Sequence, residues 1–237
     1  MANTINFSLQ LGELVAIVGA NGVGKSTLLR TLAAVQPKLS GKIQLNDKEL
    51  QAHTPTSLAK ELSIVLTEPI SSKNLTVNEV VALGRHPYTN WIGTLTENDR
   101  IKIRKTLMLT NMLELQYKRC YELSDGQLQK AMITRALAQD TPLMILDEPT
   151  THLDIYHKAY ILKLLKKIAH ETQRAVLFSS HEIEMAIQLC DKILVMTPTG
   201  SIFGQPFELI EQNTFSNLFP KDLIDFDAAS GTFKINK

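Results

Sequence analysis

The most constraining feature of the sequence is a glycine-rich loop between an apolar run and a helical pattern. Residues 19–27 read GANGVGKST and match the phosphate-loop spacing GxxxxGK[ST]. The apolar run at 14–18 suits a buried strand of a parallel sheet, and helical spacing extends from 26 to about 35. Glycines let the backbone N–H groups converge on an anion, and the helix start adds positive potential. This order predicts strand, phosphate-binding loop and helix.

The loop residues predict a site for a nucleoside triphosphate. Lys25 supplies a point charge for the β- and γ-phosphates, and the Ser26 hydroxyl suits Mg²⁺. The purely structural alternative is a glycine-rich turn without a ligand, and the position of the loop between strand and helix argues against it. The expected nucleotide-binding residues are Gly19, Asn21, Gly22, Val23, Gly24, Lys25, Ser26 and Thr27.

The rest of the chain alternates short apolar runs with helical patterns, which is typical of an α/β domain with a mainly parallel sheet. The 237 residues, 44% apolar and 21% charged, fit one globular domain, with room for an inserted subdomain. Few strand signals occur between 77 and 139, so we expect a mostly helical insertion there. Further strands are expected at 43–45, 62–66, 143–146, 176–178 and 193–196, and helices at 156–172 and 182–189.

The charge and the apolar pattern of the sequence argue against several classes of function. The net charge of +1 gives no sign of a nucleic-acid partner. No apolar run has the 18 or so residues that span a bilayer, and the first ten residues do not read as a secretory signal. Cys120 and Cys190 are isolated and predict plain thiols in a reducing compartment. We therefore expect a soluble intracellular protein that works at a membrane only through a partner.

Acidic residues follow one predicted strand at the edge where open α/β sheets bind ligands. Residues 143–148 read LMILDE and end in Asp147, which can hold Mg²⁺, and Glu148, which can polarise an attacking water. The structural alternative is a favourable acidic helix start. His181 follows the strand at 176–178, and this position favours a role at the γ-phosphate over a purely structural one.

A third segment, ELSDGQ at 122–127, precedes a strongly helical run. Ser124 and Gln127 have the spacing of a capping box, which alone is a sufficient structural reason for the segment. A capped helix start beside Gly126 is also a good anion site.

Taken in order, GANGVGKST, LSDGQ, LMILDEP, THLD and SSH resemble the ATP-binding cassette ATPases over nearly the whole chain. The resemblance implies a RecA-like P-loop NTPase core with an inserted helical subdomain. The implied single domain is 1–237, with the core at 1–73 and 140–237 and the helical subdomain at about 74–139. It also implies ATP and Mg²⁺ as ligands, and a head-to-tail dimer with two ATP molecules between the copies.

The family's site residues are carried over onto matching positions only. By resemblance, Glu148 and His181 are catalytic, and Asp154 is the D-loop residue that links the two sites. Ser124, Gly126 and Gln127 act as the signature on the ATP held by the other copy. The implied Mg²⁺ ligands are Ser26, Glu68 and Asp147.

The sequence departs from the family pattern in three ways. Glu68 stands where the family has glutamine, which adds a negative charge near the triphosphate. Asp125 replaces the first signature glycine. Only 24 residues precede Lys25, so the family's first strand and its adenine-stacking aromatic are expected to be missing, and Phe7 lies too close to the loop to replace that aromatic.

Residues 74–88, NLTVNEVVALGRHPY, are similar to a segment of importers for ferric siderophores, haem and cobalamin. This resemblance implies permease subunits, an indirect substrate-binding protein and a peripheral position on the cytoplasmic face of the membrane. An amphipathic helix with a Gly-Arg-x-Pro turn is the bland alternative. A metal chelate, above all an iron complex, is the expected cargo. The alternatives are a cobalamin importer ATPase, a non-transport cytosolic cassette ATPase, and a regulatory module that binds ATP without hydrolysing it.

Overall fold

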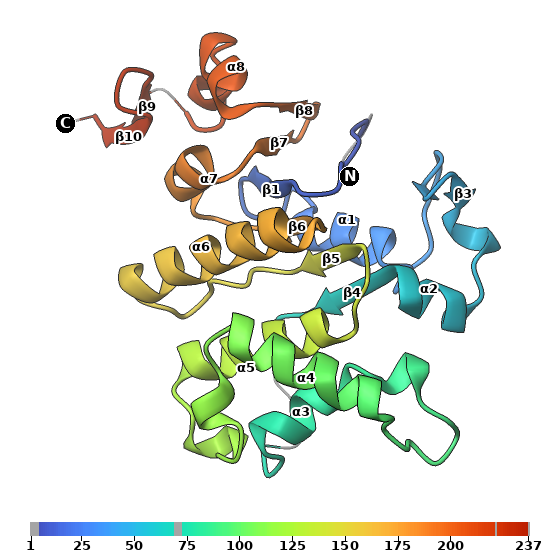
Figure 1. Cartoon of the computed structure of the whole chain (residues 1–237). Helices are drawn as coiled ribbons and strands as arrows, with labels where there is room; N and C mark the ends of the chain where they lie inside the picture. The colour runs from blue at the N-terminus through green and yellow to red at the C-terminus, as the bar shows by residue number, and fades with distance from the viewer. Residues whose placement is uncertain (1–4, 69–72, 221, 237) are drawn as a thin grey trace.

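The computed structural model describes residues 5–68, 73–220 and 222–236 (Figure 1). Its centre is a six-stranded sheet of order β4-β5-β6-β1-β7-β8, in which all neighbours are parallel except the antiparallel β7 and β8. The predicted mainly parallel α/β sheet is therefore confirmed. The strands are β1 (Leu14–Gly19), β4 (Leu62–Val65), β5 (Leu143–Leu146), β6 (Ala175–Ser179), β7 (Lys192–Thr197) and β8 (Gly200–Gly204).

Successive side chains of each strand point to opposite faces of the sheet, and both faces are buried because helices cover them. In β1, Leu14, Ala16 and Val18 belong to one apolar cluster, which includes residues of α6 (Ile155–Thr172) and α7 (Ile183–Leu189). Val15 and Ile17 belong to the other, which includes residues of α1 (Lys25–Leu32) and α2 (Pro55–Glu61). This packing explains the continuous apolar run of β1.

Two short hairpins and one helix complete the part of the chain around the sheet. They are the pair β2 (Gln44–Leu45) and β3 (Lys48–Glu49), helix α8 (Pro206–Glu211), and the C-terminal pair β9 (Ile224–Asp227) and β10 (Thr232–Ile235). Within the described residues, no helix combines the length and apolar character that a bilayer span requires.

The expected helical insertion is a block of three α-helices below the sheet in Figure 1. The block consists of α3 (Val77–Leu83), α4 (Glu97–Leu109) and α5 (Asp125–Ala138). Their apolar faces share a separate cluster, to which Val77, Ile103 and Ala131 belong. This arrangement supports the division into core and helical subdomain, while the boundaries at 74 and 139 stay a prediction.

Two predicted helical patterns ran past the ends of their helices. The spacing indicated a helix to about 35, but α1 ends at Leu32, because Ala34 has a φ of 56°. The helical spacing of Ile101, Ile103, Leu107, Leu109 and Leu113 predicts a helix that reaches Leu113, but α4 ends at Leu109, before Asn111 with a φ of 53°. A left-handed residue cannot continue a right-handed helix.

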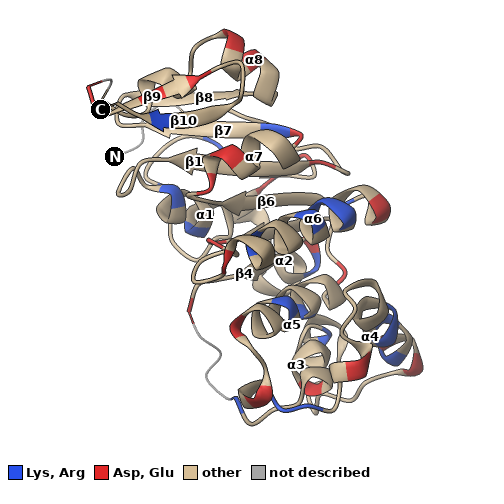
Figure 2. Ribbon diagram, turned by 90° about the vertical axis from the view of Figure 1, so that its left-hand side faces the viewer, with Lys and Arg blue, Asp and Glu red and all other residues tan. Residues whose placement is uncertain are grey.

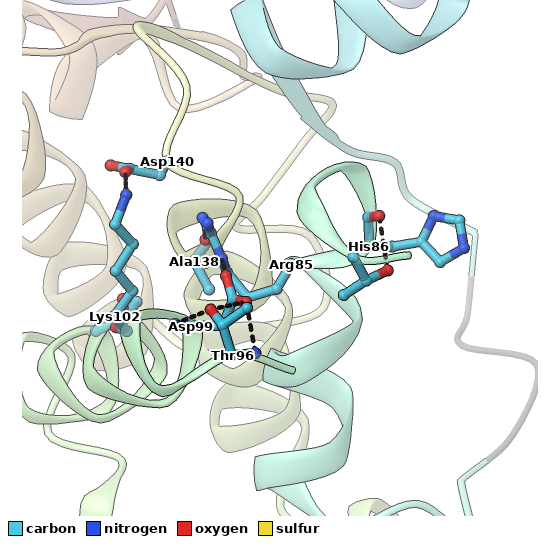
Figure 3. A network of polar contacts seen from close by, with 9 residues as sticks. Arg85, His86, Thr96, Asp99, Lys102, Ala138 and Asp140 are labelled. Carbon is cyan, nitrogen blue, oxygen red and sulfur yellow. Dashed lines mark hydrogen bonds and ion pairs between the residues drawn. The ribbon is translucent and has the colours of Figure 1, made fainter. Parts of the chain in front are cut away.

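A buried arginine holds the three helices of the block together (Figure 3). Arg85, only 2% exposed, donates from Nε to Oδ1 of Asp99 at 2.9 Å and from Nη1 to the carbonyl of Ala138 at 2.8 Å. Its guanidinium carbon lies 4.0 Å from the ring centroid of Tyr88. Burial alone would raise the pKa of Asp99, but hydrogen bonds from Thr96 and Arg85 outweigh it and lower that pKa. The buried charges of Arg85 and Asp99 are thus compensated by each other and by hydrogen bonds with Ala138 and Thr96.

A second ion pair network ties this block to the sheet. Asp140, just after α5, accepts from Lys102 of α4 (Figure 3). It also accepts from Arg174, which immediately precedes β6. Arg174 also donates to the carbonyl of Leu137 at 3.0 Å. Asp140 therefore connects the helical block with the sheet.

Replacing Arg85 with methionine leaves the Asp99 carboxylate buried without its cation, so we expect a loss of about 3–5 kcal/mol in unfolding free energy at pH 7. Urea unfolding measures this loss. Because the Asp99 pKa is lowered in the folded state, its stabilisation is present above about pH 4 and is lost as the pH falls below that value. The control is Arg100→Met, at an exposed position of α4 next to Asp99, and it should change the unfolding free energy little. Equal losses for both variants would contradict the prediction.

Candidate nucleotide-binding site

The phosphate loop connects the end of β1 to the start of α1 and depends on glycines. A methyl group at Gly19 would lie 2.3 Å from the carbonyl oxygen of Met196 on β7, so only glycine fits. Gly22 and Gly24 have φ values of 77° and 104°, which favour glycine. Gly24 is the N-cap of α1 and, having no side chain, cannot itself accept the N–H groups of the first turn. These groups point towards the loop, where an anion would be bound.

Lys25 is buried inside this loop. Its Nζ donates to the carbonyls of Gly19 at 2.9 Å and Ala20 at 3.1 Å, and lies 3.5 Å from Nδ1 of His181. Burial lowers the pKa of Lys25, while the charges of Glu148 and Asp147 oppose that shift. The ammonium is therefore held at the place where the loop would receive phosphate.

Asp147 joins three elements at the carboxyl edge of the sheet. Its Oδ1 accepts from the Ser26 hydroxyl of α1 at 2.9 Å and from the Ser179 hydroxyl of β6 at 2.7 Å. Its own N–H donates to the carbonyl of Val65 on β4 at 2.8 Å. Asp147 is only 3% exposed, so its carboxylate is buried and these hydrogen bonds fix its position.

The donor set at Asp147 fits Mg²⁺. Hydroxyl and carboxylate oxygens are suitable ligands, and Mg²⁺ is commonly held by one or two protein oxygens together with substrate phosphates and water. Within the described residues, no cluster of three or more histidine, cysteine or acidic side chains forms a cage for a metal by itself. A site completed by phosphate oxygens is therefore the kind that Ser26 and Asp147 can form.

Glu148 is held beside this site in an unusual backbone conformation, with a φ of 47°. Its N–H donates to Ser179 Oγ at 2.9 Å, and Oε1 lies 2.7 Å from Nε2 of His181. Burial alone would raise the pKa of Glu148, but hydrogen bonds from Thr151 and His181 outweigh it and lower that pKa. The side chain also lines an open cavity of about 210 Å³ together with His181.

The contacts of His181 indicate its tautomer. A carboxylate only accepts, so Nε2 carries the proton towards Glu148, which leaves Nδ1 as the acceptor facing Lys25. The structure thus brings together Lys25, Ser26, Asp147, Glu148 and His181.

The other predicted site residues lie elsewhere. Ser124 and Gln127 form the predicted capping box at the start of α5, with reciprocal contacts of 3.3 and 3.2 Å. Both Figure 1 and Figure 2 place α5 in the helical block, away from α1. Asp154 caps α6. Glu68 pairs with Arg30 at 2.9 Å, in an exposed position, and its role as an Mg²⁺ ligand stays a prediction.

Ser179 is a site residue that the sequence reasoning missed. It supports both acidic residues, because its hydroxyl donates to Asp147 and accepts from the Glu148 N–H. The available signal was its place at the end of the strand next to β5, since Leu146 pairs with Phe178 in parallel register.

These features define a P-loop protein of the cassette type, and comparison with known proteins agrees. Residues 2–151 match the family described as ABC transporter, and the chain belongs to that family. Members of this family in general hydrolyse ATP. The predicted ABC ATPase fold and family are thereby confirmed.

Relatives and solved structures cover most of the chain. An uncharacterised ABC transporter ATP-binding protein of Methanocaldococcus jannaschii is 39% identical over 98% of this chain and 80% of its own length. The petrobactin import ATP-binding protein FpuD of Bacillus anthracis is 33% identical over 96% and 84%. The iron(3+)-hydroxamate import ATP-binding protein FhuC of Bacillus subtilis is 33% identical over 92% and 81%. An inward-facing metal-chelate type ABC transporter superposes with a TM-score of 0.80 at 26% identity, over 97% of this chain and 87% of that chain.

Replacing Ser179 with alanine removes one donor to Asp147 and the acceptor of the Glu148 N–H. We expect Mg²⁺-dependent nucleotide affinity to fall about tenfold or more, as for other groups that orient a metal ligand. Titration of Mg²⁺ against a fluorescent ATP analogue measures this. Ser180→Ala is the matched control, because the Ser180 hydroxyl accepts instead from the Glu182 N–H at 2.9 Å. Identical Mg²⁺ titrations for Ser179→Ala and the unchanged protein would refute the assignment.

Proposed function

We propose that the chain hydrolyses Mg²⁺-ATP as the ATP-binding subunit of an importer for a metal chelate, in the first place a ferric siderophore. The observation that carries the hydrolase part is a continuous set of contacts at one sheet edge. It runs from Lys25 through His181 to Glu148, with separations of 3.5 and 2.7 Å, beside the Ser26–Asp147 pair.

The phosphate loop is proposed to bind the triphosphate of ATP. Backbone N–H groups and the α1 start surround the phosphates, and Lys25 adds its charge. The proposed nucleotide-binding residues are those of the sequence prediction, Gly19, Asn21, Gly22, Val23, Gly24, Lys25, Ser26 and Thr27.

Glu148 is proposed to orient the attacking water and to take up its proton. Its lowered pKa keeps the carboxylate ionised, and His181 holds it in place through Nε2. Ser26 and Asp147, with Glu68 as a further ligand, are proposed to hold Mg²⁺, which when bound neutralises charge on the β- and γ-phosphates.

A second copy of the chain is the proposed partner that completes the site. Ser124, Gly126 and Gln127 lie in the helical block, so their proposed contact is with ATP held by the other copy. The N-terminus of α5 suits an anion there. Exposed apolar residues beside Asp154, Ile155 at 76% and Tyr156 at 70%, support an interface at this place.

Replacing Glu148 with glutamine keeps the shape of the side chain but removes its basic oxygen. We expect ATP turnover to fall at least 100-fold, within the range of a general base, while nucleotide binding is retained. Phosphate release and fluorescent-nucleotide binding measure the two effects. Glu182→Gln, whose carboxylate pairs instead with Lys158, is the matched control. Unchanged turnover in Glu148→Gln would sink the catalytic assignment.

Two observations support the proposal that the chain serves an importer: its similarity to importer subunits and one exposed apolar loop. Siderophore importer subunits align over most of the chain, and the segment 74–88 resembles theirs. Arg85 of this segment is buried, so it cannot contact a permease directly. The neighbouring loop instead presents Trp91, 94% exposed, and Ile92, 68% exposed, in a turn held by the side chain of Asn90. We propose that this loop contacts the permease at the cytoplasmic face of the membrane, with a substrate-binding protein acting indirectly.

Liposomes that contain the chain and its copurified permease test the importer. We expect a ferric siderophore to stimulate ATP hydrolysis, and Trp91→Ala to lose this stimulation without losing hydrolysis by the isolated chain. Leu39→Ala, 83% exposed on the sheet part, is the matched control. Stimulation by cobalamin alone would show that cobalamin, and not a ferric siderophore, is the cargo. Stimulation by an exported lipid or drug would overturn the importer assignment.

A further inference from the structure

The starts of two helices from distant parts of the sequence contact each other through one imidazole. Gly126 lies in the first turn of α5, and His157 lies in the first turn of α6. A methyl group in place of a Gly126 α-hydrogen would lie 2.9 Å from Cδ2 of His157, and 3.4 Å from its Cγ. The ring of His157 therefore rests directly on the backbone of the LSDGQ segment.

Hydrogen bonds to Asp154 fix the position of this ring. The His157 N–H donates to Asp154 Oδ1 at 2.8 Å, and Nδ1 lies 2.9 Å from both carboxylate oxygens. The carboxylate only accepts, so Nδ1 carries a proton. The same contacts, the backbone one first, lower the pKa of Asp154. With Nδ1 held on one side, the opposite edge of the imidazole points at Gly126.

An added methyl group at position 126 would approach the ring too closely, so that the ring would have to shift. A flexible neighbour would move away from an added methyl group, but the His157 ring cannot do so without breaking its contacts with Asp154. Helix propensity alone would favour alanine over glycine in α5. A contact within one chain is therefore a reason for glycine at this position, in addition to its proposed contact with the ATP of the other copy.

We propose that His157 is a positioning residue that sets the distance between the Asp154 turn and the Ser124–Gln127 turn, so that both meet the second copy in register. This inference rests on the proposed dimeric ATPase, in which both turns face the other copy. Neither His157 nor Gly126 needs to touch the reacting phosphate for the contact to matter. A shift of the ring displaces both turns at once.

A double-mutant cycle tests the contact. Gly126→Ala is expected to lower kcat about tenfold, because the added methyl group displaces the ring and with it the two turns that meet the second copy. In a His157→Ala background the methyl group fits beside position 126, so the same change should lower kcat by a clearly smaller factor, and the remaining loss reports the contact of Gly126 with the ATP of the other copy. An equal loss in both backgrounds would show that glycine is needed only for the partner's ATP, and would overturn the proposal.

Two single variants separate the two contacts of the ring. His157→Phe keeps a ring on Gly126 but loses the donor to Asp154, whereas His157→Asn keeps a donor near Nδ1 but loses the ring. We expect both to lower kcat while the affinity of the phosphate loop for nucleotide stays unchanged. His170→Asn is the matched control, because it removes a comparable contact, to Asp191 at 2.9 Å, further along the same helix. Wild-type kcat in both His157 variants would refute the positioning role.

Urea unfolding tests the contact without relying on ATP hydrolysis. It is measured on the unchanged chain, the two single variants Gly126→Ala and His157→Ala, and the double variant. If the unchanged chain does not hydrolyse ATP, the proposed function fails, but the steric coupling between positions 126 and 157 must still appear as non-additive unfolding midpoints. Additive midpoints together with additive kcat values would overturn the inference and leave the proposed function intact.

Discussion

The candidate site depends on one shared acceptor, Oδ1 of Asp147. Ser26 and Ser179 both donate to this oxygen, so a single atom links the start of α1 to the ends of β5 and β6. A buried carboxylate is tolerated only when its hydrogen bonds are satisfied, and here they come from the elements that frame the nucleotide site. The same interaction therefore stabilises the sheet edge and preorganises the proposed Mg²⁺ ligands.

Glu148 extends this arrangement towards the reaction. Its N–H is anchored on the same Ser179, and its carboxylate is oriented by His181. The positive φ of Glu148 is a strained conformation, which persists because the surrounding contacts determine it. Strain of this kind, at the end of a buried strand and beside a phosphate loop, is consistent with a side chain positioned for chemistry.

The helical block has its own internal connection. Arg85 joins α4 and α5 from the turn after α3, and Asp140 joins the block to the residue before β6. Because α5 begins at the LSDGQ segment and ends at these contacts, one helix connects that segment with the buried arginine.

The sequence by itself determined the phosphate loop, the parallel α/β sheet, the helical insertion and the family. These follow from local periods and short motifs, in which residue type and spacing dictate backbone geometry. Helix ends were missed where single residues such as Ala34 and Asn111 adopt positive φ, which no periodicity reveals. Only the tertiary structure decided that Ser179 supports both acidic residues, that Arg85 is buried, and that His157 rests on Gly126. Each of these contacts joins residues far apart in the chain, and their distances depend on how the sheet and helices pack.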